Sequence, residues 1–422
     1  MVSLYGAWRR ALRLVAYAAL AVQPVFAAGY DAPADTLTLD DALRRTFEAS
    51  PHLRAARLEL EAREALARQA GRFSNPVLDA EAENIGATGP EQGVVTVALA
   101  QLVELGGDRA ARRRLATREA DLAAADLALA RTERSALARS RYAEAVAAQA
   151  RLGLALASAH LTRATLVATA EQVEAGDRSP VDETRAEVAL AIAQAEATQA
   201  QAERTAAFVR LAALWTESPD FDAVAALPPP EPVPAFDVLA GPLRQSAALA
   251  VWDVETARRE VAVDLEKARR IPDVTVSAGY RRFTATGGGA AVVGLAVPLP
   301  VFDRNGGAVA AARARLQAAD AEREVALVEA RSALAEAHGA LTASFAEATA
   351  FRIEVLPRAE DVAARIEEGY EAGKFSLLDV LDAQRTLAAA RVRYADALAA
   401  YHTAAADVER LTARPIRLTD QP

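Results

Sequence analysis

Hydrophobic and polar residues follow two different periods along this chain. Most of the sequence is rich in alanine and leucine at helical spacing, and Leu115, Leu122 and Leu129 recur every seventh residue. Wide alanine-rich faces of this kind suit close packing of helices on two sides. The pattern predicts a first helix capped by Thr38, with Asp41 at capping-box spacing, and a kink or break at Pro357. The predicted helices cover residues 39–72, 108–175, 181–215, 236–270, 307–372 and 376–412.

In two shorter regions apolar residues alternate with polar ones, which predicts β-strands with one apolar face. In the first region, Leu78, Ala80 and Ala82 alternate with acidic residues. In the second, a run of three glycines at 287–289 separates the two alternating segments and predicts a turn. The strands are expected over residues 77–85 and 94–103 in the first region, and over 274–283 and 291–299 in the second.

The same order of elements occurs twice. Residues 171–190 reappear in altered form at 368–387, where Glu174-Ala175-Gly176 corresponds to Glu371-Ala372-Gly373 at a spacing of 197 residues. Two copies of one unit predict a single pseudo-symmetric body rather than two unrelated domains. The first repeat is predicted at 37–225, with a β-hairpin at 76–104 and a helical hairpin tip at 174–182. A Pro-rich linker at 226–235 leads to the second repeat at 236–413, with a β-hairpin at 272–302 and a tip at 371–379.

The first 27 residues have the features of a secretory signal peptide. Arg9, Arg10 and Arg13 precede a short apolar run, and Val25-Phe26-Ala27 offers small residues at a cleavage site. The chain contains no cysteine, which excludes disulfides, thiolate metal sites and cysteine nucleophiles. Its formal charge of −9 argues against binding to nucleic acid. The four histidines lack metal-ligand spacing, and no cofactor motif is recognisable. We therefore expect an exported protein without a metal, a cofactor or a catalytic residue.

Each predicted strand has about ten residues, the length at which a tilted strand crosses a bilayer. Four strands cannot close a barrel, and open sheet edges are not tolerated in lipid, so closure requires several chains. Three chains would supply twelve strands. The apolar positions would then face lipid and the polar positions the lumen. The lipid-facing set is Val95, Val97, Leu99, Val293, Leu295 and Val297, and the lumen-facing set is Asp79, Glu81, Glu83, Thr275, Ser277 and Arg281.

Three segments resemble outer-membrane efflux proteins of the TolC type. They are QLVELGGDR at 101–109, VPLPVFDRNGG at 297–307 and YEAGKFSLLDVLDAQRTL at 370–387. The first two are most similar to the CzcC-type branch, which serves heavy-metal resistance–nodulation–division (RND) pumps. The resemblance covers residues 37–412. It implies a mainly α-helical homotrimer with a twelve-stranded membrane β-barrel that continues as a long α-helical barrel.

The resemblance also implies a location and a function. The barrel would lie in the outer membrane and the helical part in the periplasm, where it would meet a periplasmic membrane-fusion adaptor and an inner-membrane RND pump. The chain would be a passive exit duct for divalent heavy-metal cations such as cobalt, zinc or cadmium. Two alternatives stay open: a TolC-like duct for drugs, solvents or type I secretion, and a soluble periplasmic coiled-coil or adaptor protein.

In the same family, residues near each tip form the periplasmic gate. The resemblance therefore marks Asp182, Asp379 and Asp382 as gate-lining acids, with Tyr370 and Arg178 as candidates for holding the gate shut. Relatives often have a basic residue where this chain has Phe375. First-turn acids also stabilise a helix N-terminus, so a structural role for the aspartates is equally consistent with their positions. The candidates for adaptor contact are Gly176, Ser179, Gly373, Ser376 and Leu377.

Overall fold

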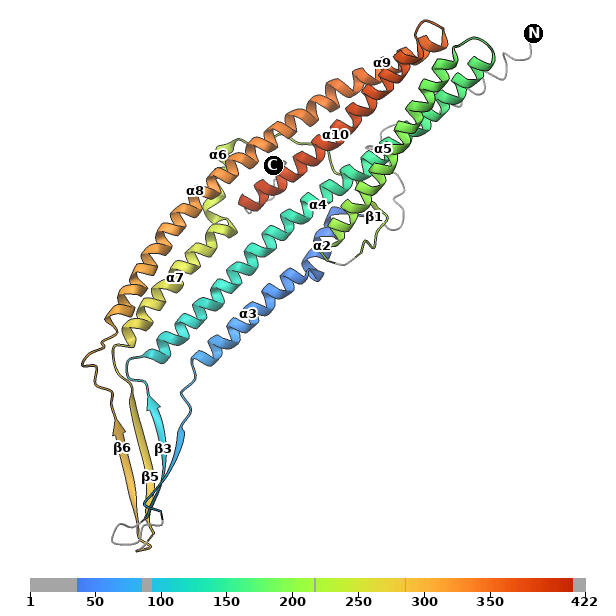
Figure 1. Cartoon of the computed structure of the whole chain (residues 1–422). Helices are drawn as coiled ribbons and strands as arrows, with labels where there is room; N and C mark the ends of the chain where they lie inside the picture. The colour runs from blue at the N-terminus through green and yellow to red at the C-terminus, as the bar shows by residue number, and fades with distance from the viewer. Residues whose placement is uncertain (1–35, 86–92, 216–217, 285, 413–422) are drawn as a thin grey trace. The chain divides into compact units, whose positions relative to one another are not determined.

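The computed structural model describes residues 36–85, 93–215, 218–284 and 286–412 (Figure 1). The predicted signal peptide lies outside these residues. Two compact units are present, and each draws on both halves of the sequence. We call them the sheet unit, residues 52–130 and 244–330, and the tip unit, which contains the remaining described residues. Among the described residues, no helix combines the length and apolarity needed to cross a membrane.

The sheet unit contains one antiparallel sheet in the order β2-β3-β5-β6. The central strands, β3 (Val94–Val103) and β5 (Val274–Phe283), have the bounds predicted from the alternating pattern. The outer strands have other bounds than predicted. β2 spans Val77–Glu83 rather than 77–85, and β6 spans Gly289–Ala296 rather than 291–299. Val297 therefore lies just beyond β6. Pairing of β3 with β5 joins the two halves of the sequence within one sheet (Figure 1).

The strand register separates apolar from polar side chains. Leu99 pairs with Leu78 on one side and Ala278 on the other, and Ala278 in turn pairs with Val293. Side chains at directly paired positions share a face, so these residues form an apolar surface. On the opposite face, Glu81, Thr96 and Arg281 are paired in the same way, and Arg281 Nε donates a hydrogen bond to Thr96 Oγ1 at 3.0 Å. The predicted division of the strands into two faces is confirmed.

Serine and proline residues mark several helix ends. The prediction of one helix over 39–72 is wrong, because α2 (Leu39–Ala49) ends at Ser50 and α3 (Pro51–Ala70) follows it. The residue before a proline is disfavoured in the helical region, and Ser50 has ψ of 121°. The predicted Thr38 cap is confirmed, since its side chain accepts a hydrogen bond from the Asp41 N–H.

The predicted helix over 236–270 is also interrupted. The segment consists of α6 (Phe236–Ala240), a 3₁₀ turn η1 (Gly241–Gln245) and α7 (Ala247–Ala268). Pro242 lacks the N–H that a continuing helix would use. Ser246 then caps α7 by accepting a hydrogen bond from the Leu249 N–H at 3.4 Å.

The core of the tip unit surrounds Tyr142, which is 1 % exposed. Tyr142 belongs to α4 (Asp108–Glu174), and its hydroxyl lies 3.0 Å from the Leu37 carbonyl and 2.8 Å from that of Ala225. Leu37 belongs to β1 (Thr36–Leu37), and Ala225 directly follows β4 (Ala223–Val224), which pairs with β1 in parallel. Burial raises the pKa of Tyr142, so the phenol stays protonated. A single hydroxyl thus connects two distant chain segments to a helix.

The Pro-rich linker is fixed to the helices of the tip unit. Nε2 of His402 lies 2.9 Å from the Pro228 carbonyl, and Nε2 of His338 lies 3.0 Å from that of Pro234. Between them, the Tyr401 hydroxyl bonds to both the N–H and the carbonyl of Glu231. Burial lowers the pKa of His402, which favours its neutral form. The two histidines therefore have a structural role.

Pro357 changes the helix type before it. The α8 helix (Gly306–Ala350) passes into a π-helical turn, η2 (Phe351–Val355), and then into α9 (Leu356–Glu371). A proline inside a helix removes one i→i−4 hydrogen bond, and a π turn accommodates that loss. The predicted break is therefore a change of hydrogen-bond spacing. Two further helices, α5 (Pro180–Ala212) and α10 (Leu377–Thr412), complete the tip unit.

Two carboxylates lack partners where strands and helices meet in the sheet unit. The Oδ1 atoms of Asp108, at the start of α4, and Asp273, just before β5, are buried and have no hydrogen-bond partner among the described residues. Asp108 is 9 % exposed. Burial, and secondly the charge of Asp273, raise the pKa of Asp108, while Arg269 opposes the shift. The nearby Glu104 is already bound by Arg112 at 2.6 Å. The junction therefore holds more negative charge than its arginines neutralise.

We predict that Asp108→Asn stabilises the protein at neutral pH. The amide removes one buried charge and offers a donor beside Asp273, and an unsatisfied buried group costs about 1–3 kcal/mol. Because the folded-state pKa of Asp108 is raised, its ionisation destabilises the fold as pH rises through that pKa. The advantage of Asn should therefore be full at neutral pH and disappear as pH falls towards 3.8, the ordinary value.

Thermal unfolding at pH 7 and at pH 4 to 5 measures this difference. The matched control is Asp264→Asn, because Asp264 is an exposed acid paired with Lys267 at 3.0 Å. Its effect should stay within about 0.5 kcal/mol. An Asp108→Asn protein that is less stable than the parent at pH 7 would contradict the prediction.

Candidate functional site

The first helical hairpin tip is closed by a glycine in the left-handed region. After α4 ends at Glu174, Gly176 has φ of +80°. Its N–H donates to the Val173 carbonyl at 3.0 Å, and the Asp177 N–H donates to the Gln172 carbonyl at 2.9 Å. This pair of bonds is the Schellman motif, which satisfies the last carbonyls of a helix.

The second tip repeats this geometry 197 residues later. After α9, Gly373 has φ of +72°. Its N–H donates to the Tyr370 carbonyl at 3.0 Å, and the Lys374 N–H donates to the Gly369 carbonyl at 2.7 Å. The two tips thus share their backbone hydrogen bonds as well as their sequence.

The helices after the two tips begin differently. At the first tip, Ser179 accepts a hydrogen bond from the Val181 N–H at 3.2 Å, and Pro180 is the first helical residue. At the second, Ser376 and Asp379 form a reciprocal capping box. The hydroxyl and N–H of Ser376 each donate to Asp379 Oδ2 at 2.7 Å, and the Asp379 N–H donates back to the hydroxyl at 3.3 Å. These bonds from the hydroxyl, and then from the N–H, lower the pKa of Asp379.

The three aspartates of the tips therefore have three different environments. Asp379 caps α10, so the structural role considered from the sequence is present. Asp182, at the equivalent position of α5, instead pairs with Arg185 at 3.4 Å. Asp382 is exposed, and its side chain makes no hydrogen bond or ion pair with any described residue. Asp382 is the acid whose charge is most available to a ligand or to another chain.

Tyr370 and Arg178 come together and connect the two tips. The guanidinium of Arg178 lies over the Tyr370 ring at 4.7 Å, and the Tyr370 hydroxyl lies 3.4 Å from Gln172 Oε1. A cation over an aromatic face is attracted by the ring electrons. Phe375 does not take part, because its ring lies against Gly369, where a larger side chain would clash.

One predicted contact residue is buried. Leu377 is 2 % exposed and packs with Ala189, Leu381 and Tyr370, so the expectation that its side chain is exposed is wrong. Because Ser376 caps α10, Leu377 is the first helical residue and turns towards α5. The neighbouring Leu378 is 54 % exposed. The other four candidates for adaptor contact, Gly176, Ser179, Gly373 and Ser376, are exposed.

A groove of about 700 Å³ lies between the first turns of α5 and α10. Its apolar wall includes Val181, Val188 and Leu378. Its charged residues are Asp379, Asp382, Arg185 and Arg385. Sequence reasoning identified the two acids of this groove but missed both arginines. The sequence could have indicated these arginines, because Arg185 follows Asp182 by three residues and Arg385 follows Asp382 by three.

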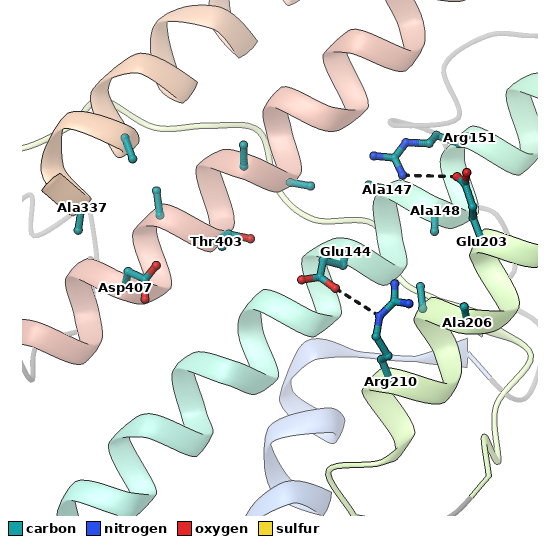
Figure 2. A pocket seen from close by; sticks show the side chains of 15 residues that line it. Glu144, Ala147, Ala148, Arg151, Glu203, Ala206, Arg210, Ala337, Thr403 and Asp407 are labelled. Atoms are coloured by element: carbon teal, nitrogen blue, oxygen red, sulfur yellow. Dashed lines mark ion pairs between the residues drawn. The ribbon is translucent and has the colours of Figure 1, made fainter. Parts of the chain in front are cut away.

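A second cavity, of about 690 Å³, lies between α4, α5, α8 and α10 and is lined mainly by alanine (Figure 2). Figure 2 shows that Arg210 points to Glu144 and Arg151 to Glu203, at 3.8 and 3.9 Å. Arg151 also pairs with Asp396 at 2.6 Å. Glu144, Arg151, Glu203 and Arg210 are therefore all engaged in ion pairs at this cavity. The described residues also contain no cluster of three or more side chains able to hold a metal.

Comparison with solved structures identifies the fold. The CusC channel aligns with a TM-score of 0.75 at 15% identity, covering 92% of this chain and 97% of that one. The outer-membrane protein VceC of Vibrio cholerae aligns with a TM-score of 0.70 at 22% identity, covering 89% and 95%. The fold is that of outer-membrane channels, and the predicted class, mainly α-helical with a β-sheet part, is confirmed.

The family follows from the sequence. The model of the family described as outer membrane efflux protein matches residues 42–217 and 242–414, and the chain belongs to this family. The cobalt-zinc-cadmium resistance protein CzcC of Cupriavidus metallidurans is 37% identical, over 90% of this chain and 91% of the relative. The nickel-cobalt-cadmium resistance protein NccC of Alcaligenes xylosoxydans xylosoxydans is 29% identical, over 66% and 64%. The predicted resemblance is confirmed, and the protein is located in the outer membrane with its helical part in the periplasm.

We predict opposite effects of alanine at a tip glycine and at a glycine inside a helix. Gly373→Ala forces a side chain into the left-handed region, which costs about 1–2 kcal/mol. Gly153→Ala, inside α4 and with open space around it, should stabilise by about 0.5–1 kcal/mol because alanine loses less backbone entropy. Thermal unfolding of the two variants measures the contrast. Equal effects of the same sign would contradict the assignment of Gly373 as a helix terminator.

Proposed function

We propose that this chain is the exit channel of a tripartite RND-type pump that exports divalent heavy-metal cations such as cobalt, zinc or cadmium. The observation that carries the proposal is the 37% identity to the cobalt-zinc-cadmium resistance protein CzcC, because it extends over nearly the full length of both chains. Two further relatives support the same class of cargo: NccC is named for nickel, cobalt and cadmium resistance, and CnrC for nickel and cobalt resistance.

A homotrimer is the assembly that the sheet favours. Strands β2 and β6 are the two edges of the four-stranded sheet, so each has a row of backbone groups without a partner among the described residues. Such groups are not tolerated in lipid. Three copies would join β6 of one chain to β2 of the next and close a barrel of twelve strands. The face containing Leu99 and Val293 would meet lipid, and the face containing Glu81 and Arg281 would line a wet lumen.

The tips are proposed to form both the gate and the contact with a periplasmic membrane-fusion adaptor, which connects the channel to an inner-membrane RND pump. Gly176, Ser179, Gly373 and Ser376 are exposed at the turns and fit the adaptor surface. Three copies of Asp182, Asp379 and Asp382 would give the aperture a negative potential that attracts cations. Tyr370 and Arg178, in contact within one chain, would fix the two tips relative to each other. The duct would be passive, without a cofactor or a catalysed reaction.

We predict that deleting the gene lowers tolerance to cobalt, zinc or cadmium, because the exported cations would lose their exit across the outer membrane. The minimum inhibitory concentration of each metal measures the change, and expression of the intact chain should restore it. Antibiotics and organic solvents are the comparison cargo. Unchanged metal tolerance together with lost drug tolerance would contradict the metal cargo and favour a channel for drugs or solvents.

We also predict that Asp379→Asn with Asp382→Asn weakens block of the channel by divalent cations. Asparagine at 379 keeps an acceptor for Ser376, so α10 remains capped while the charge is lost. In planar bilayers, the Co²⁺ concentration that halves the current should rise about tenfold, because several carboxylates leave one aperture. The control is Asp361→Asn, an exposed acid on α9 that pairs with Arg365. Unaltered block in the double variant would show that these residues do not line the constriction.

A further inference from the structure

The apolar face of the four-stranded sheet contains one arginine. The strand register places Arg282 of β5 between Val95 on β3 and Gly289 on β6. Because successive side chains of a strand point to opposite faces, this row belongs to the same face as Leu99 and Val293. The other described strand residues on this face are uncharged, and most are valine, leucine or alanine. Arg282 is therefore its sole charged side chain among the described strand residues.

The preceding arginine has a different environment. Arg281 lies on the opposite, polar face, in the row of Glu81 and Thr96, and its Nε donates a hydrogen bond to Thr96 Oγ1 at 3.0 Å. Arg282 is exposed, and its side chain makes no hydrogen bond or ion pair with any described residue. Two neighbouring residues of the same type thus differ in face and in partners. The charge of Arg282 is available to a group outside the described part of the chain.

Arg282 lies at the end of β5 that is remote from the helices. The strand begins at Val274, shortly after α7, and ends at Phe283, where the turn to β6 follows. Since the helical part of the protein is in the periplasm, the turn end of the strand belongs to the outer side of the membrane. A charged side chain on the lipid face is costly at the bilayer midplane but much less so near the interface, which a long arginine side chain can reach.

A tyrosine on the same face brings a hydroxyl to the row of Arg282. Tyr280 precedes Arg282 by two residues and is 57% exposed. Its side chain extends across Gly289 of the neighbouring strand, where an added methyl group would clash with the hydroxyl. Because Gly289 is paired with Arg282, the hydroxyl reaches the level of the arginine. A guanidinium and a phenol, both hydrogen-bond donors, therefore lie at one place on the sheet.

We propose that Arg282 and Tyr280 bind the phosphate group of a phosphorylated glycolipid in the outer leaflet of the membrane. This inference rests on the proposed function, in which the apolar face of the sheet meets lipid. Arginine forms charge-assisted hydrogen bonds with phosphate oxygens and often engages two of them at once. Tyrosine is favoured at the membrane interface, and its hydroxyl donates a further bond. The valines and leucines nearer the helices would contact the acyl chains of the same lipid.

Native mass spectrometry of the detergent-purified protein tests this site. The probes are lipid A with two phosphates and the same lipid after removal of both phosphates. The parent protein should bind the phosphorylated lipid about tenfold more tightly, and Arg282→Gln should reduce this preference to within about twofold. Tyr280→Phe keeps the ring over Gly289 but removes the donor, so the preference should fall about threefold. A full preference in Arg282→Gln would overturn the proposal, and a full preference in Tyr280→Phe would overturn the role of the tyrosine.

The matched control is Arg281→Gln, which removes the same charge one residue earlier but from the polar face. It should keep the full preference for the phosphorylated lipid. Equal losses in Arg281→Gln and Arg282→Gln would show that net charge decides the binding, and this would overturn the proposal. Inorganic phosphate at the concentration of the lipid should not displace it. Displacement by inorganic phosphate would identify a site for the free anion and would also overturn the lipid assignment.

Failure of this proposal is distinguishable from failure of the proposed function. The mass of the parent assembly gives the number of chains, and current across a planar bilayer shows whether the assembly forms a channel. A parent protein that forms neither trimers nor channels would contradict the proposed function. A trimeric, conducting parent that binds the two lipids equally would contradict the phosphate site alone.

Discussion

The structure depends on one constraint: every backbone N–H and carbonyl of the four strands must find a partner. Pairing of β3 with β5 satisfies the inner strands and joins the two halves of the sequence. The edges of β2 and β6 are satisfied in lipid only by other chains. Closure by three copies, as proposed above, would give twelve strands, and each copy would bring two helical hairpin tips. The gate proposed at the tips is thus a consequence of hydrogen bonding in the sheet.

Alanine determines how the helices pack. Much of the buried surface of α5 consists of Ala186, Ala189, Ala193, Ala197 and Ala200, which repeat at intervals of three and four residues. Such small side chains let neighbouring helices approach closely but remove little apolar area from water per residue. Larger groups are concentrated instead around Tyr142, where Phe208, Trp215 and Phe221 pack together. The helices consequently depend on a local aromatic core and on ion pairs such as that of Arg151 with Asp396.

Prediction from the sequence worked where the pattern is strictly local. The central strands and the Thr38 cap follow from alternation and from capping chemistry, and the structure has them where expected. The helix breaks before Pro51 and at Pro242 were not predicted, because alanine-rich periodicity continues on both sides of each proline. Leu377 was misjudged because its exposure depends on which face α10 turns towards α5, and that is decided by packing. That Arg185 and Arg385 line a groove with the aspartates also required the structure, since the sequence does not show that side chains of α5 and α10 meet there.

The π-helical turn before Pro357 has a consequence for the direction of side chains near the second tip. A turn of this kind accommodates one residue more than a regular helical turn, and each residue of an α-helix rotates the chain by about 100°. All side chains of α9 therefore point in directions that a continuous α-helix from α8 would not have given them. The contacts of Tyr370 with Gln172 and Arg178 therefore depend on the extra residue in the π-helical turn. A one-residue deletion within 351–355 would leave α9 helical but aim its tyrosine at a different neighbour.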